Sequence, residues 1–204
     1  MNELENKIFV EKYRPSKIDD LICSNKDLIC DFLKYPLKMP SFLLHSSSAG
    51  TGKTSLAKIF TSQLKCDTLT LNASKERGID TIREQVSCFV EHMSSSTSSK
   101  RMVFMDEADF LTAQAQGSLR NMIEEYSDNV FFVFTCNDIS KIIEPIRSRC
   151  VVVNFSNPSK ASILSRLEYI CNEEKIEYEI ENLATLMDLY YPDIRSMIKS
   201  LQNV

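Results

Sequence analysis

The segment from Ser46 to Ser55 carries the residues best suited to chemistry in this chain. It follows an apolar run, Phe42 to Leu44, and precedes a helical pattern. A strand that ends in a Gly-rich turn and opens a helix directs backbone N–H groups and the positive end of the helix dipole at one point. This pattern predicts a phosphate-binding loop, in which Lys53 reaches the outer phosphates and Thr54 ligates Mg²⁺. The residues of the loop are Ser47, Ser48, Ala49, Gly50, Thr51, Gly52, Lys53, Thr54 and Ser55.

The loop departs from the general pattern at its first residue. Ser47 stands where the pattern has Gly, so the backbone there must suit a residue with a Cβ. A second interpretation of the segment alone is a Gly-rich turn that caps a helix.

Two acidic residues and an amide follow other apolar runs. Asp106 and Glu107 end the run Met102 to Met105, and Asn137 follows Val133 to Cys136. We expect Asp106 to hold the magnesium through water and Glu107 to polarise an attacking water as a general base. Asn137 could hydrogen-bond both a terminal phosphate and that water. Taken singly, the carboxylates could be an acidic turn and Asn137 a helix cap.

Strand and helix patterns alternate through the first three quarters of the chain. The strands are expected at 42–45, 68–72, 102–106, 130–136 and 151–155, and helices at 54–64, 79–93 and 114–126. A further helix is expected to begin near Ser24 or Asn25, after an extended lead-in from Ile8 to Pro15. Near-continuously apolar strands alternating with helices predict an α/β fold with a parallel sheet covered on both faces. Ligands bind such sheets at the carboxyl ends of the strands, where the Ser46 loop lies.

The last quarter of the chain has a different pattern. After Phe155 the strand signals stop, and three helices are expected at about 159–173, 180–190 and 192–203. We expect two units, residues 1–155 and a small all-helical unit over 156–204. The Ser-rich stretch 94–99 reads as a surface loop.

Composition excludes several classes of protein. The chain has 204 residues, of which 43% are hydrophobic and 25% charged, enough for one substantial core. No apolar run approaches the roughly 20 residues of a membrane-spanning helix, and residues 1–6 do not resemble a signal peptide, so a cytoplasmic or nuclear location is expected. The seven cysteines are scattered, which favours neither a zinc site nor a disulfide framework. A net charge of −4 limits any DNA contact to a local surface.

Further motifs extend along nearly the whole chain. They are the segments 10–15, 49–55, 71–80, 106–109, 136–137, 141–145, 148–150 and 192–195. In order and spacing they resemble the small ATPase subunit of a sliding-clamp loader of the replication factor C type, in the AAA+ superfamily. The Asp-Glu-Ala-Asp quartet at 106–109 also occurs in a group of helicases, but the Ser-Ala-Thr element of those helicases is missing.

The resemblance implies roles for residues that the spacing leaves unassigned. Adenine would bind among Val10, Tyr13, Arg14 and Ile22, and Arg195 would approach the γ-phosphate from the helical lid formed by residues 156–204. The arginine of Ser148-Arg149-Cys150 would reach into the site of a neighbouring subunit. An arginine finger supplied in trans stabilises the charge that develops in phosphoryl transfer, so hydrolysis would require assembly. The alternative for Arg149 is a surface salt bridge.

The same resemblance implies partners. DNA would contact helix N-termini through Arg77, Gly78, Ile79, Arg83 and Thr112, which read the backbone without base specificity; solvated helix caps are the alternative. Residues 89–93 and the Ser-rich loop would touch the clamp, although the apolar stripe of this helix also suits a core. The implied assembly is a pentameric spiral of clamp-loader subunits acting with a sliding clamp and primer-template DNA, with no membrane contact.

The implied function is an ATPase that couples ATP and Mg²⁺ binding to clamp opening and loading. The resemblance implies that relatives carry a further C-terminal collar domain, and we expect it to be absent from residues 1–204. Two other functions stay open: a helicase loader or initiator ATPase of the same superfamily, and a non-hydrolysing scaffold subunit. A subunit that no longer hydrolyses ATP has no chemical need for the catalytic residues. The hypothesis of a scaffold subunit is therefore disfavoured by the presence of Lys53, Thr54, Asp106, Glu107 and Asn137.

Overall fold

A five-stranded parallel sheet forms the centre of the chain. A computed structural model describes residues 8–23, 25–75, 78–91, 99–155 and 158–203. The strand order is β2-β3-β4-β1-β5, with all four pairings parallel. The strands are β1 Phe42–His45, β2 Thr68–Asn72, β3 Arg101–Asp106, β4 Val130–Cys136 and β5 Val151–Asn154. The predicted parallel sheet is confirmed, and the strand bounds differ from the predicted ones by at most one residue.

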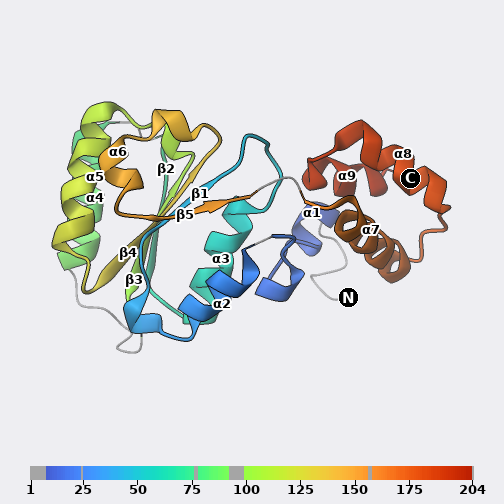
Figure 1. The fold of residues 1–204 in the computed structure, drawn as a ribbon, viewed down its shortest axis with the longest axis horizontal. Coiled ribbons are helices and arrows are strands. Elements are labelled where there is room, and N and C mark those ends of the chain that lie inside the picture. Colours follow the sequence, from blue (N-terminus) through green and yellow to red (C-terminus); the bar gives the residue numbers. More distant parts are fainter. Residues whose placement is uncertain (1–7, 24, 76–77, 92–98, 156–157, 204) are drawn as a thin grey trace.

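Helices cover both faces of the sheet, because alternate residues of each strand point to opposite faces. Val103 and Phe132 enter one apolar cluster, whereas Phe104 and Val133 enter another. Figure 1 shows α4, α5 and α6 on the first face and α2 and α3 on the second. These helices are α2 Lys26–Leu33, α3 Lys53–Leu64, α4 Ile79–Glu91, α5 Ala113–Glu125 and α6 Glu144–Arg147. Short 3-10 turns lie at Ile18–Asp20, Pro36–Lys38, Ala108–Phe110 and Ile139–Lys141.

The C-terminal helices build a separate apolar cluster. They are α7 Lys160–Glu174, α8 Ile180–Tyr190 and α9 Ile194–Leu201. Their buried side chains include Ile163, Leu167, Met187 and Met197. Figure 1 shows these helices beside the sheet, next to the tip of the loop that joins β1 to α3. We call α7, α8 and α9 the lid.

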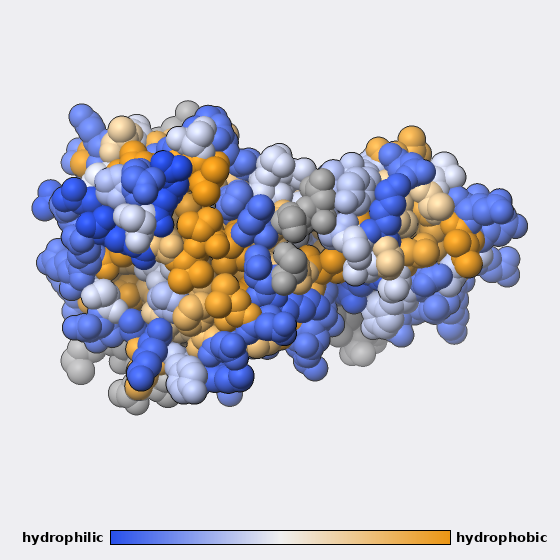
Figure 2. All heavy atoms as spheres, viewed as in Figure 1, coloured by the Kyte–Doolittle hydropathy of each residue, from blue (hydrophilic) through white to orange (hydrophobic). Residues whose placement is uncertain are grey.

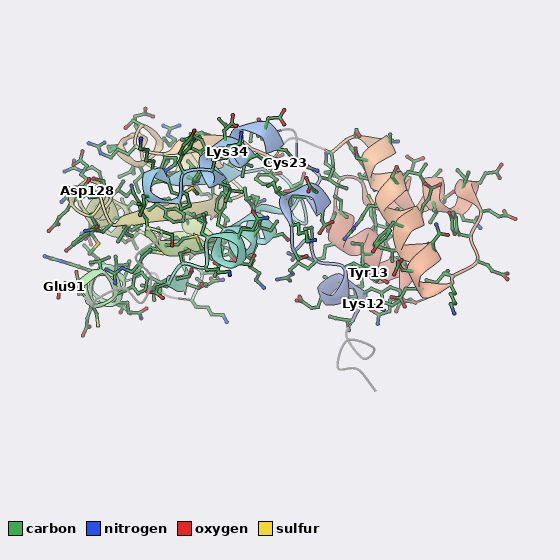
Figure 3. The ribbon with its side chains drawn as sticks, turned by 90° about the horizontal axis from the view of Figure 1, so that it is seen from below. Lys12, Tyr13, Cys23, Lys34, Glu91 and Asp128 are labelled. Atoms are coloured by element: carbon green, nitrogen blue, oxygen red, sulfur yellow. The ribbon has the colours of Figure 1, made fainter. Side chains whose placement is uncertain are left out.

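The N-terminal segment corrects one expectation. Residues Phe9–Lys12 form a short helix, α1, where the sequence analysis expected an extended lead-in. So short a helix has little stability of its own. Phe9 and Tyr13 lie four residues apart with their rings edge to face at 5.8 Å, and both pack into the apolar cluster of the lid. Tertiary packing therefore decides the local structure, and Figure 3 shows Lys12 and Tyr13 beside the lid helices.

The strand β5 forms one edge of the sheet. Val152 on this strand is exposed, as is Leu28 on α2. In Figure 2 apolar surface gathers over the part of the molecule where Figure 1 draws β5, and hydrophilic residues surround it. Among the described residues, no helix combines the length and apolar character that a membrane crossing requires.

Candidate functional site

The loop between β1 and α3 folds around two glycines. Gly50 has φ +71° and Gly52 has φ +105°, in the left-handed region that a residue without a Cβ adopts readily. The Ser46 hydroxyl accepts a hydrogen bond from the Ser48 N–H at 3.2 Å and helps to close the turn. Gly52 is the N-cap of α3, and no side chain caps this helix. The first N–H groups of the helix are therefore open to an anion.

Lys53 lies at the centre of the loop. Its side chain is buried, and the Nζ donates to the carbonyls of Ser46 at 3.4 Å and Ser48 at 2.9 Å and to Asn137 Oδ1 at 3.0 Å. Burial lowers the pKa of Lys53, and the nearby charges of Asp109 and Asp106 oppose this shift. The tip of β1 and the tip of β4 are thus joined through one ammonium group.

Asp106 joins the tip of β3 to the same centre. Because residues alternate along β3, Asp106 follows Met102 and Phe104 onto the face that α3 covers. Its Oδ1 accepts from the Thr54 hydroxyl at 3.3 Å. Glu107, the next residue, is left-handed with φ 58° and ψ 42°, so the chain turns sharply after Asp106.

The donor atoms at this point suit one kind of metal ion. Within the described part of the chain, no three histidine, cysteine or acidic residues gather as a metal cluster. Mg²⁺ is commonly held by one or two carboxylates together with substrate phosphates and water. The Thr54 hydroxyl at the N-terminus of α3 and the Asp106 carboxylate at the tip of β3 provide that donor set, so Thr54 and Asp106 fit the ion.

A pocket opens between the loop, the N-terminal segment and the lid. Of the residues predicted from the sequence, those lining it are Val10, Tyr13, Arg14, Ile22, Gly50, Thr51, Gly52, Lys53, Thr54, Ser55 and Arg195. Ser47 and Ala49 are exposed on the loop outside this lining. The structure therefore brings the phosphate loop, the predicted adenine-binding residues and the lid arginine to one cavity.

Several lining residues were missed from the sequence: Pro15, Asp20, Leu21, Arg166, Ile194 and Ile198. Arg166 on α7 donates to the Tyr13 carbonyl at 3.0 Å. Glu174, also on α7, accepts from Lys12 Nζ at 2.6 Å and from the Tyr13 hydroxyl. These contacts fasten the N-terminal wall of the pocket to the lid. No motif or spacing distinguishes Arg166 from other helix-surface arginines.

The lid touches the phosphate loop at Gly50. A Cβ added there would lie 1.9 Å from Asp193 Oδ1 and 3.3 Å from Arg195 Cβ. Asp193 is the N-cap of α9, and its Oδ1 accepts from the Ser196 N–H at 3.2 Å. The close approach of Asp193 and Arg195 requires a glycine in the loop.

Arg149 lies away from the pocket of its own chain. It follows α6, and its Nε donates to Glu124 Oε1 at 2.6 Å while its Nη1 donates to the Pro145 carbonyl at 2.8 Å. Its side chain is partly exposed, next to the start of β5. In the single chain Arg149 thus forms an ion pair with Glu124, as the alternative interpretation of a surface salt bridge expected.

The predicted DNA-contacting residues lie at two helix N-termini. Gly78 and Ile79 open α4, and Arg83 is exposed one turn further along. Thr112 is the N-cap of α5, where its hydroxyl accepts from the Ala115 N–H at 3.2 Å. Helices α4 and α5 are neighbours on one face. Arg77 lies outside the described residues.

Part of the predicted clamp-contacting segment is packed inside. Val90 is buried and Phe89 packs against the same apolar cluster, with the Arg101 guanidinium 5.0 Å from the Phe89 ring centroid. Residues 92–98 lie outside the described residues. Val90 therefore belongs to the hydrophobic core, which was the alternative interpretation of the apolar residues of this helix.

These features define a class of protein. A parallel sheet with a Gly-rich loop between its β1 strand and a helix, and a carboxylate on a neighbouring strand tip, is a P-loop nucleotide-binding fold. The family model of the AAA family, ATPases associated with various cellular activities, matches residues 43–157. The chain belongs to this family.

Two relatives are similar over almost the whole chain. The replication factor C small subunits of Sulfurisphaera tokodaii and Saccharolobus solfataricus are each 40% identical, over 97% and 98% of this chain. The chain spans 62% of the length of each of these proteins.

Solved structures support the fold. A variant of RuvB from Thermotoga maritima superposes with a TM-score of 0.76 at 17% identity, covering 94% of this chain and 64% of that one. The T. maritima RuvB Holliday junction branch migration motor gives a TM-score of 0.72, also at 17% identity and with the same coverage. This likeness confirms the AAA+ P-loop fold with a helical C-terminal part.

Proposed function

We propose that this chain is the ATPase subunit of a DNA sliding-clamp loader and couples ATP binding and hydrolysis to clamp loading at primer-template DNA. The observation that carries the proposal is the convergence of Lys53, Thr54, Asp106 and Asn137 at three strand tips. The similarity to replication factor C small subunits over nearly the full chain supports the particular task.

The nucleotide would span the pocket from the N-terminal segment to the loop. Adenine would lie among Val10, Tyr13, Arg14 and Ile22, which line the same cavity as Lys53. The phosphates would accept the hydrogen bonds that Lys53 Nζ now donates to the carbonyls of Ser46 and Ser48. Thr54 and Asp106 would hold Mg²⁺, which when bound neutralises phosphate charge.

Hydrolysis would use groups at the tips of β3 and β4. Glu107 would accept a proton from the attacking water, and Asn137, already bonded to Lys53, would orient that water against the terminal phosphate. Arg195 lines the pocket from α9 and would add positive charge at the terminal phosphate. Positioning and charge stabilisation account for most catalysis of phosphoryl transfer.

Assembly would complete the site. Arg149 does not line the pocket of its own chain, and it lies by the exposed edge strand β5. A neighbouring subunit seated on this edge would receive Arg149 at its γ-phosphate, and the Glu124 ion pair would orient the guanidinium until then. DNA phosphates would contact the N-termini of α4 and α5, where Gly78, Ile79, Arg83 and Thr112 lie, together with Arg77.

The test is the ATPase rate of the protein with its partner subunits, with and without a sliding clamp and primed DNA. We expect clamp and DNA together to stimulate hydrolysis. Glu107→Gln should bind ATP without hydrolysing it, and Arg149→Ala should bind ATP but lose the stimulation. Arg147→Ala is the matched control, because Arg147 at the end of α6 lies two residues before Arg149 but pairs with Glu144.

Other results of these assays would favour a different function. Hydrolysis that clamp and primed DNA leave unchanged would contradict clamp loading and favour another AAA+ task. Undiminished stimulated turnover by Arg149→Ala would rule out a finger supplied in trans. A wild-type protein that binds ATP but never hydrolyses it would indicate a scaffold subunit.

A further inference from the structure

Thr135 is a buried polar residue at the centre of the site that no motif assigns. It lies on β4, two residues before Asn137, and is 2% exposed. Its hydroxyl donates to Asp106 Oδ1 at 2.6 Å and accepts from the Glu107 backbone N–H at 2.9 Å. One hydroxyl group therefore holds both residues of the acidic pair on the neighbouring strand.

The backbone at Glu107 needs such support. Its φ of 58° and ψ of 42° place a residue with a Cβ in the left-handed region, which sterics disfavour. The N–H of Glu107 points back at β4, and Thr135 Oγ1 is its partner. Without that acceptor a part-buried donor would be unsatisfied and the turn would lose a restraint.

The same hydroxyl also restrains Asp106. Oδ1 of this carboxylate accepts from Thr135 at 2.6 Å and from Thr54 at 3.3 Å, so the shorter bond comes from β4 and the longer one from α3. Hydrogen bonds to a charged acceptor are the stronger kind. The carboxylate is thus pinned between the phosphate loop and the strand that leads to Asn137.

We propose that Thr135 is a positioning residue that sets the Asp106 carboxylate for Mg²⁺ and the turn at Glu107 for water activation. This inference rests on the proposed ATPase function. Thr135 does not line the pocket and acts through its two neighbours, Asp106 and Glu107. A fixed geometry of supporting groups is what phosphoryl transfer requires, because small displacements are costly in rate.

The test compares Thr135→Val with Thr135→Ser in the protein assembled with its partners. Valine keeps the shape and removes both hydrogen bonds, whereas serine keeps the hydroxyl. Ser41→Ala is the matched control, because the Ser41 hydroxyl accepts from the Phe132 N–H at 3.0 Å near the opposite end of the same strand. All three variants are first checked for the wild-type far-UV circular dichroism.

Four readouts separate positioning from a general loss of stability. For Thr135→Val we expect kcat to fall about 10- to 100-fold, the scale of losing a hydrogen bond to a charged group. The KM for ATP should change less than about threefold, while the Mg²⁺ concentration for half-maximal rate should rise. Hydrogen exchange of the Glu107 amide should accelerate. Thr135→Ser and Ser41→Ala should stay near wild type in kcat, Mg²⁺ dependence and Glu107 exchange.

The inference is overturned if Thr135→Val matches wild type in kcat and Mg²⁺ dependence. It is also overturned if Ser41→Ala loses as much activity, or if Thr135→Ser behaves like Thr135→Val. A wild-type assembly that hydrolyses no ATP would refute the proposed function, and the positioning role with it. An unchanged exchange rate at Glu107 in Thr135→Val refutes the positioning role alone.

Discussion

The contact between the phosphate loop and the lid can be tested with Gly50→Ala. Gly50 has φ +71°, which alanine adopts at a cost of roughly 1–2 kcal/mol. The new Cβ would lie 1.9 Å from Asp193 Oδ1, so the Asp193 side chain must move. That oxygen caps α9, and losing such a cap costs about 0.5–2 kcal/mol. The two effects sum to roughly 1.5–4 kcal/mol of unfolding free energy.

Urea unfolding followed by circular dichroism measures this cost, and calorimetry with ATP measures its effect on the site. We expect a lower unfolding midpoint and weaker ATP binding, because Arg195 lies 3.3 Å from the same Cβ. Gly117→Ala is the control: nothing lies within 4 Å of its added Cβ on α5. That variant should be more stable by about 0.5–1 kcal/mol. An unchanged midpoint and ATP affinity in Gly50→Ala would refute the loop–lid contact.

Two further predictions concern the lid and the thiols. Hydrogen bonds from Lys12 and Tyr13 lower the pKa of Glu174, so its stabilising contribution is present above the ordinary pKa of 4.5 and disappears as the pH falls through the folded-state pKa. Glu174→Gln should therefore cost about 0.5–1 kcal/mol of unfolding free energy at pH 7 and less at pH 3. An equal cost at both would contradict the charge contribution. Burial raises the pKa of Cys136 and Cys150 to about 12, so iodoacetamide at pH 8 should alkylate the exposed Cys88 first, as followed by mass spectrometry. Native-state alkylation of Cys150 as fast as that of Cys88 would show that the thiol is not buried.

The sheet could be predicted because the pattern of apolar residues in its strands is local and strong. Apolar runs such as 130–136 are buried along their whole length, and only a parallel sheet covered on both faces buries such strands. The strand order was not predictable, because it depends on pairings between residues far apart in the chain. The helix α1 was mispredicted for a similar reason, since Phe9 in this helix and Tyr13 directly after it pack on the lid, far away in the sequence.

Some residues of the candidate site could likewise be predicted from the sequence, and others could not. Lys53 and Asp106 could be identified because they follow apolar strands in recognisable order, and the structure brings their elements together. Thr135 carried a weaker signal: it lies two residues before Asn137, on the same face of an alternating strand. Arg166 had none, because its place in the pocket depends on how α7 packs against the N-terminal segment.

Calorimetric titration of the chain with ATP and Mg²⁺ shows whether the phosphate loop and the strand tips bind a nucleotide. We expect saturable heat with one site per chain, no heat for Lys53→Ala, and wild-type heat for Lys58→Ala, which removes an exposed lysine from the same helix. Absence of heat with the wild-type chain, or binding by Lys53→Ala equal to wild type, would contradict the claim that strand tips and phosphate loop enclose a magnesium-bound nucleotide.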